Sequence, residues 1–275
     1  MATATKLKVK TAKLRTGVTL HYVEQGDPEG IPVVLLHGVT DSWHSFEPVL
    51  PDLPPSIHAF ALTQRGHGDA DRPADGYRCA DFAADVAAFL DAQEIESAVV
   101  VGHSMGSSVA LRFSIDYPAR TLGLVVVGTF VSYRTNPVIS EFWEEVVSIL
   151  EDPIDPSIAR EFQESTLAKP IPPAFLDLAV AESLKVPARV WRAVFANLVE
   201  TDFSAELSQI AAPTFVVWGD QDAFCPRRDQ DDLIAKIAGA RLAVYAGSGH
   251  AVHWEEPARF ATDLTAYVDR MDAGR

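Results

Sequence analysis

Short apolar runs rich in β-branched residues alternate with helical patterns along most of this chain, and this alternation restricts the fold more than any other feature. Six runs lack the polar alternation of a strand with one wet face, so we expect strands that are buried on both faces. They are Ile31–Leu36, Ile57–Leu62, Ala98–Val101, Leu122–Val127, Thr214–Trp218 and Leu242–Ala246. The clearest helical patterns are Asp81–Ala92, Met105–Tyr117, Asp231–Ala238 and Ala258–Val268. The alternation predicts an α/β fold with a doubly wound, mostly parallel sheet.

The first residues follow a different pattern. Leu7–Arg15 and Val18–Gln25 flank a Thr16-Gly17 turn, which is typical of an antiparallel hairpin. With the six buried runs, these two segments predict a sheet of eight strands.

One long interval contains no strand pattern. Between Tyr133 and Gln209 the chain has only helical segments separated by prolines, at Val138–Leu150, Ser157–Ala168, Pro173–Lys185 and Ala188–Val199. A structureless loop of this length is improbable in a compact domain. We therefore expect residues 133–209 to form a helical cap inserted into a core made of residues 1–132 and 210–275. Open α/β sheets bind ligands at the carboxyl ends of their strands, so we expect the cap there.

Charge and composition exclude several classes of function. The 38 acidic residues outnumber the 23 basic ones, giving a formal charge of −15 that would repel a nucleic acid. No run approaches the roughly 18 apolar residues of a membrane-spanning helix, and Met1–Arg15 lacks the apolar stretch of a secretory signal. We expect a cytoplasmic protein that binds neither nucleic acid nor membrane.

Cys79 and Cys225 form neither a metal spacing nor a disulfide framework, so we expect free thiols and no metal.

Gly102-His103-Ser104-Met105-Gly106 is a candidate nucleophile site. It matches Gly-x-Ser-x-Gly, in which small outer residues permit a strained turn that exposes the serine oxygen. The pentapeptide alone is moderate support, because Ser104 is equally acceptable as an ordinary turn residue. Its context favours the nucleophile, since a buried strand precedes it and a helical pattern follows.

A serine hydroxyl becomes nucleophilic when a base takes its proton and an acid orients that base. Asp220 and Asp222 follow the run Thr214–Trp218, and His250 follows Leu242–Ala246. The chain order of serine, acid and histidine is the order that this architecture uses. His253 is the competing base, although it lies beyond the loop that ends at His250.

These segments resemble the α/β-hydrolase superfamily, in its small capped serine hydrolase and esterase branch. His37-Gly38, Arg65-Gly66-His67-Gly68 and Trp254-Glu255-Glu256-Pro257 add to the resemblance, which covers nearly the whole chain. It implies that Ser104 is the nucleophile, His250 the base and Asp222 the acid. It also implies that the backbone N–H groups of Val39 and Met105 bind the oxyanion. It also implies that Asp222 is preferred over Asp220 and that His37 braces the loop of Val39.

The chain departs from its relatives at two kinds of position. Thr63 and Ala70 stand where relatives often have Asp and Ser, which weakens a structural turn. Ser104 lies at the centre of the strained turn Gly102–Gly106, called the nucleophile elbow. A serine at this position separates the chain from the haloalkane dehalogenase and epoxide hydrolase branches, whose nucleophile is Asp.

The expected function is a cofactor-free serine hydrolase of small or medium carboxylic esters, lactones included. One alternative is hydrolysis of a carbon–carbon bond in ring-cleavage products, although such relatives tend to carry Ser-Gly-Pro-Gly where this chain has Val39-Thr40-Asp41-Ser42. A ligand-sensing or signalling protein that keeps the triad is another. A monomer and a homodimer are both open, and Arg112, Arg134 and Arg192 are candidates for attracting an anionic substrate.

Overall fold

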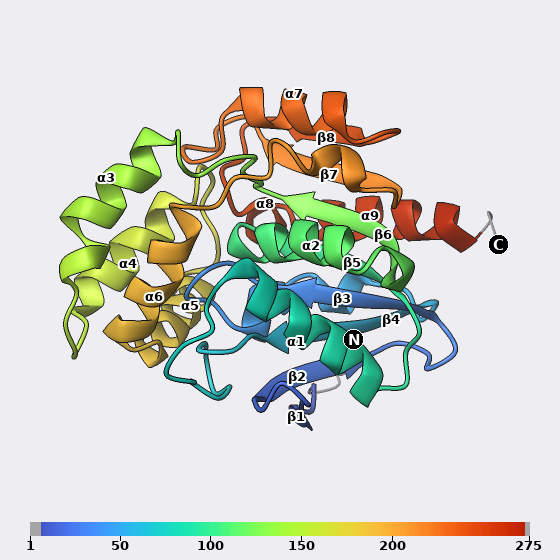
Figure 1. Ribbon diagram of the computed structural model, residues 1–275, viewed down its shortest axis with the longest axis horizontal. Coiled ribbons are helices and arrows are strands. Elements are labelled where there is room, and N and C mark those ends of the chain that lie inside the picture. The colour runs from blue at the N-terminus through green and yellow to red at the C-terminus, as the bar shows by residue number, and fades with distance from the viewer. Residues whose placement is uncertain (1–6, 273–275) are drawn as a thin grey trace.

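The computed structural model describes residues 7–272, in which eight strands form one sheet of order β1-β2-β4-β3-β5-β6-β7-β8 (Figure 1). The strands are β1 (Lys10–Lys13), β2 (Thr19–Gln25), β3 (Ile31–Leu36), β4 (Ile57–Thr63), β5 (Ala98–His103), β6 (Thr121–Val127), β7 (Thr214–Gly219) and β8 (Arg241–Tyr245). The pairs β1–β2 and β2–β4 are antiparallel, and every neighbouring pair from β4 to β8 is parallel. The predicted doubly wound, mostly parallel sheet is confirmed.

The N-terminal hairpin is shorter than predicted. Of the expected strand Leu7–Arg15 only Lys10–Lys13 pairs with β2, and Gly17 makes the turn with a φ of 86°. Met1–Lys6 lie outside the described residues.

Alternate residues of the central strands face two separate apolar layers, as the pleat of a strand requires. Val34, Leu36 and Val100 share a buried cluster with residues of α1, α2 and α7. On the other face Val33 and Leu35 pack with residues of the 3-10 turns η1 and η2 and of the helices α8 and α9. The bounds are α1 (Cys79–Ala92), α2 (Met105–Asp116), α7 (Arg227–Lys236), α8 (Val252–Glu255), α9 (Pro257–Asp272), η1 (Trp43–Phe46) and η2 (Leu50–Asp52); a further turn, η3 (Pro118–Arg120), precedes β6.

The segment between β6 and β7 is helical. It contains α3 (Pro137–Glu145), η4 (Val147–Ile149), α4 (Pro156–Ser165), α5 (Pro173–Lys185), α6 (Ala188–Leu198) and η5 (Leu207–Gln209). Figure 1 shows α3–α6 gathered beyond one end of the sheet. Several of its aromatic residues pack on one another: the ring centroid of Phe162 lies 5.3 Å from that of Phe142 and 5.5 Å from that of Trp191.

A buried ion pair ties the loop after β4 to α1. The Nε and Nη2 atoms of Arg65 each donate to a different carboxylate oxygen of Asp85 at 2.6 Å, and the hydroxyl of Thr16 donates to Asp85 Oδ1 at 2.6 Å. Such a bidentate arrangement fixes geometry as well as charge. Between residues 7 and 272, no helix has both the length and the apolar composition that crossing a membrane requires.

Candidate active site

Ser104 lies at a strained bend between β5 and α2. Its φ of 54° and ψ of −118° are unfavourable for a residue with a side chain, and such strain concentrates at functional sites. The two flanking glycines permit the bend: a Cβ on Gly102 would lie 2.1 Å from the carbonyl oxygen of Gly106, and one on Gly106 would lie 2.2 Å from that of Leu36. The strand, the turn and the helix that the motif requires are therefore all present.

The structure brings His250 and Asp222 together. Asp222 Oδ2 lies 2.8 Å from His250 Nδ1, and the two side chains are 0% and 4% exposed. The other oxygen, Asp222 Oδ1, accepts hydrogen bonds from the backbone N–H groups of Phe224 (2.8 Å) and Cys225 (2.9 Å). A proton on Nδ1 leaves the lone pair of Nε2 free to accept another.

The two competing residues have different surroundings. Asp220 accepts from the N–H of Gly247 at 2.7 Å and from the side chain of Gln221 at 3.1 Å, and these contacts hold the pKa of its exposed carboxyl below the usual range. His253 is buried in α8, and its Nε2 lies 3.0 Å from the hydroxyl oxygen of Ser45. Neither residue contributes to the Asp222–His250 pair.

The loop after β3 carries Val39. His37 links this loop to the loop after β4, because its Nε2 accepts from the N–H of Gln64 at 3.0 Å and its Nδ1 lies 2.7 Å from the carbonyl oxygen of Gly38. The next residue, Thr40, has a φ of 70°, which is a genuine outlier for a β-branched side chain. Among the residues that the structure describes, none accepts a hydrogen bond from the N–H of Val39 or of Met105.

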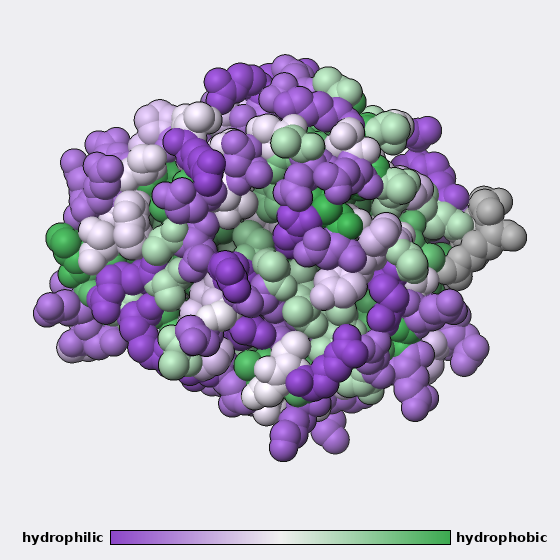
Figure 2. All heavy atoms as spheres, viewed as in Figure 1, coloured by the Kyte–Doolittle hydropathy of each residue, from purple (hydrophilic) through white to green (hydrophobic). Residues whose placement is uncertain are grey.

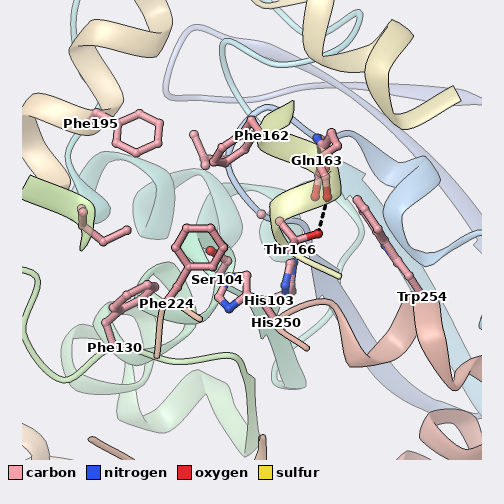
Figure 3. Close-up of a pocket in the computed structure, with 14 residues that line it drawn as sticks. His103, Ser104, Phe130, Phe162, Gln163, Thr166, Phe195, Phe224, His250 and Trp254 are labelled. Atoms are coloured by element: carbon pink, nitrogen blue, oxygen red, sulfur yellow. Dashed lines mark hydrogen bonds between the residues drawn. The ribbon is translucent and has the colours of Figure 1, made fainter. Parts of the chain in front are cut away.

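A small cavity joins these parts (Figure 3). Ser104, His250 and Val39 line it, together with a mostly apolar wall from the helical segment and from the loop after β7. The other lining residues are Gly38, Asp41, His103, Phe130, Ile139, Phe162, Gln163, Thr166, Phe195, Phe224 and Trp254. None of these lining residues is a lysine or an arginine.

Two buried ionisable groups border the cavity. Burial raises the pKa of Asp41 to about 7, and Gln163 Nε2 donates to its Oδ1 at 2.9 Å. Burial lowers the pKa of His103 well below its usual value, an effect strengthened by His253 and His250 nearby. Burial therefore favours the uncharged form of both side chains.

One group of three possible metal ligands occurs among residues 7–272. Atoms of Asp222, Cys225 and His250 lie within 4.8 Å of one another. Asp222 and His250 already satisfy one another through a hydrogen bond, and burial raises the pKa of the Cys225 thiol well above its usual value. A protonated thiol is a poor metal ligand, so the donor set fits a hydrogen-bonded pair better than a metal site.

Sequence reasoning missed Gln163, Thr166 and Asp41. The carbonyl oxygen of Thr166 accepts from the N–H groups of His250 (2.8 Å) and Ala251 (3.2 Å), so the end of α4 supports the histidine loop. Asp41 follows the His37-Gly38 pair so closely in the sequence that its place near the site could have been predicted. Gln163 and Thr166 carry no such signal, because they lie on a helix whose location the sequence does not fix.

The three arginines considered for anion binding make other contacts. Arg112 pairs with Glu206 at 2.9 Å and Arg134 with Glu200 at 3.5 Å, while Arg192 donates to the carbonyl oxygen of Leu150. None of the three lines the cavity.

The eight-stranded sheet, its strand order and the serine bend define an α/β hydrolase. Residues 33–264 match the model of the alpha/beta hydrolase family, and the chain belongs to this family. Among curated relatives, it is 28% identical to a non-heme chloroperoxidase of Streptomyces lividans, over 94% of this chain and 99% of that protein. It is 30% identical to a 2-hydroxymuconate semialdehyde hydrolase of Pseudomonas sp. (strain CF600), over 89% of each chain. Among solved structures, it resembles Est816, described as an N-acyl homoserine lactone degrading enzyme, with 26% identity, a TM-score of 0.80 and coverage of 94% and 100%.

Proposed function

We propose that this hydrolase is a cofactor-free serine enzyme that cleaves small or medium carboxylic esters, lactones included. Ser104 is the nucleophile, His250 the general base and Asp222 the acid that orients it. The observation that carries the proposal is the 2.8 Å contact between Asp222 and His250 at a cavity that Ser104 also lines. We further propose that residues 133–209 act as a cap over a core of residues 1–132 and 210–275.

The reaction proceeds through an acyl-enzyme. As Ser104 Oγ attacks the ester carbonyl, His250 Nε2 takes its proton and the imidazolium is stabilised by Asp222. The N–H groups of Val39 and Met105 donate to the oxyanion, each worth roughly 3 kcal/mol of barrier lowering. His250 then gives the proton to the leaving alcohol, and a water that His250 deprotonates releases the acid.

The alternative is hydrolysis of a carbon–carbon bond, which the 30% identity to the muconate semialdehyde hydrolase favours. A muconate carries a carboxylate, whose burial requires a cationic partner. The residues that line the cavity include no lysine or arginine. This supports the ester over the carbon–carbon substrate.

The test combines covalent labelling with a substrate panel. We expect a fluorophosphonate to modify Ser104, identified by peptide mass, and p-nitrophenyl esters or lactones to be hydrolysed by the wild type but not by Ser104→Ala. A panel that includes a dienoate ring-cleavage product separates the two chemistries. Labelling at another residue, or equal turnover by Ser104→Ala, contradicts the proposed mechanism.

A further inference from the structure

Two hollows of very different size meet at Phe162 and Phe224. The inner cavity at Ser104 has a volume of about 30 Å³, which is room for about two water molecules. The outer groove has a volume of about 730 Å³ and runs along α3, η4 and α4. Phe162 and Phe224 line both hollows. An ester larger than a few atoms therefore extends from the serine toward the groove.

The wall of the groove is mainly apolar. Besides the two shared phenylalanines, the apolar lining residues are Val138, Phe142, Val146, Ile149, Leu150, Pro153, Ile158 and Ala223. Ile149 is 72% exposed and Val138 is 41% exposed, so part of this apolar wall faces solvent. Figure 2 shows apolar surface at the left margin of the molecule, the end where Figure 1 draws α3 and α4.

The charged residues of the groove are all acidic. Glu145, Glu151, Asp155 and Glu161 line it, and no lysine or arginine does. Within residues 7–272 no basic side chain forms an ion pair with any of these four; Arg160, next to Glu161 in the sequence, pairs with Glu164 and Asp177 instead. Asp155 instead accepts from the N–H and the hydroxyl of Ser157. Arg192, which does not line the groove, donates to the carbonyl oxygen of the lining residue Leu150. The groove thus combines an apolar wall with four acidic side chains and one neighbouring arginine.

We propose that this groove binds the longer apolar arm of the ester, and that the end of this arm is uncharged or cationic. The arm passes between Phe162 and Phe224, with the scissile carbonyl at Ser104. This inference rests on the proposed ester hydrolysis. It assigns the chain to apolar esters without a terminal anion.

The test is a series of p-nitrophenyl esters and a matching series of alkyl acetates, each from two to ten carbons. Burying one methylene corresponds to about a fourfold gain, so kcat/KM should rise by up to that factor per carbon in one series until the groove is filled. At a fixed length, a terminal carboxylate should lower kcat/KM about tenfold and a terminal trimethylammonium should raise it. Both charge effects should shrink as salt shortens the Debye length below about 10 Å.

Matched variants locate the effect. Glu145→Gln, Glu151→Gln and Glu161→Gln together should remove most of the charge discrimination, and Ile149→Asn should flatten the length series. The controls are Glu141→Gln with Glu144→Gln on α3, the helix of Glu145, and Val244→Asn, because none of these residues lines the groove. Hydrolysis of the acetate through Ser104 with no dependence on length or charge overturns the groove proposal alone. Absence of hydrolysis and of Ser104 labelling contradicts the proposed function instead.

A second observation concerns the strained residue Thr40, which follows Val39. Gln163 Nε2 lies 3.3 Å from Thr40 Oγ1, 2.9 Å from Asp41 Oδ1 and 2.8 Å from the hydroxyl oxygen of Ser183. Ser183 in turn lies 3.1 Å from Thr40 Oγ1. These four side chains are at most 5% exposed. Strained backbone persists where its surroundings over-determine it, and here the surroundings come from α4 and α5.

We also infer that Gln163 is a positioning residue for the oxyanion-binding N–H of Val39. The same turn of α4 contacts the histidine loop through Thr166, so it aligns both sides of the site. Gln163→Leu removes the hydrogen bonds to the strained loop while keeping the volume of the side chain.

We expect Gln163→Leu to lower kcat by about 10- to 100-fold with KM changed less than threefold. The affinity for a boronic acid, whose adduct with Ser104 mimics the oxyanion, should fall by a similar factor. Arg189→Met is the control, because it cuts other contacts of the helical segment with the core, to the carbonyl oxygens of Arg72 (2.8 Å) and Pro73 (2.9 Å), without touching the Val39 loop or the histidine loop. Ser183→Ala serves if the first variant does not fold. Equal losses in the control, or unchanged boronic acid affinity in both test variants, overturn the inference.

Discussion

Replacing Asp222 by Asn tests the proposed acid without changing the shape of the side chain. The backbone N–H groups of Phe224 and Cys225 donate to Asp222 Oδ1. In the variant these donors require the amide oxygen at that position. The amide nitrogen then occupies the Oδ2 position, 2.8 Å from His250 Nδ1, and donates to it. His250 is thereby held with its proton on Nε2, where it cannot accept the proton of Ser104.

The size of the effect follows from the cost of the active arrangement. To restore the proton on Nδ1, the amide must flip and turn its NH₂ group toward two N–H donors. Each buried donor left without a partner costs about 1–3 kcal/mol, so the flip costs about 4 kcal/mol. At 1.36 kcal/mol per decade, kcat should fall about 10³-fold.

The assay is steady-state hydrolysis of a p-nitrophenyl ester by the wild type, Asp222→Asn and Asp220→Asn. The Asp220 variant is the matched control, because its carboxylate contacts Gly247 and Gln221 and lies outside the His250 pair. It should keep kcat within about threefold of the wild type. Loss of turnover confined to Asp220→Asn, or an Asp222→Asn variant within tenfold of the wild type, refutes the reasoning.

Two further predictions concern stability. Burial raises the pKa of Asp41 to about 7 from 3.8, so the folded state keeps a proton that the unfolded chain releases, and this contribution to stability is lost as pH rises from about 4 to 7. In urea unfolding, the free energy of unfolding of the wild type should fall by up to about 4 kcal/mol relative to that of Asp41→Asn as pH rises across that window. Parallel curves of unfolding free energy against pH for the two proteins would contradict this prediction. Arg65→Met leaves the buried Asp85 unpaired and should lower Tm by roughly 10 °C, whereas Arg227→Met, which breaks an exposed pair with Asp231, should change it by less than about 2 °C.

Much of the fold was predictable because its signals are local. A strand buried on both faces must be apolar along its whole length, and β3 has the predicted bounds Ile31–Leu36. The elbow is also local, since Gly102 and Gly106 are fixed by backbone contacts that no other residue permits. The pairing of Asp222 with His250 follows from strand order, because β7 and β8 are neighbours and their carboxyl ends share an edge.

The contacts of α4 were not predictable in the same way. Gln163 lies 122 residues from Asp41 and 123 from Thr40, and nothing in its own segment distinguishes it from other polar helix residues. Its role depends on how the helical segment docks on the sheet. That docking is a tertiary property that neither periodicity nor spacing reports.

The charge distribution around the site was likewise not predictable from the sequence alone. A charge of −15 predicts a negative surface, but charge summed over a chain does not say which substrates meet it. Arg112 and Arg134 have acidic partners of their own, so neither is free to reverse the sign at the cavity. Arg192 donates to the carbonyl oxygen of Leu150 and lines neither the cavity nor the groove. The acidic side chains of the groove have no such partners. The proposed selectivity against anions depends on the four carboxylates of the groove, and neutralising these four should change it far more than neutralising four others elsewhere on the surface.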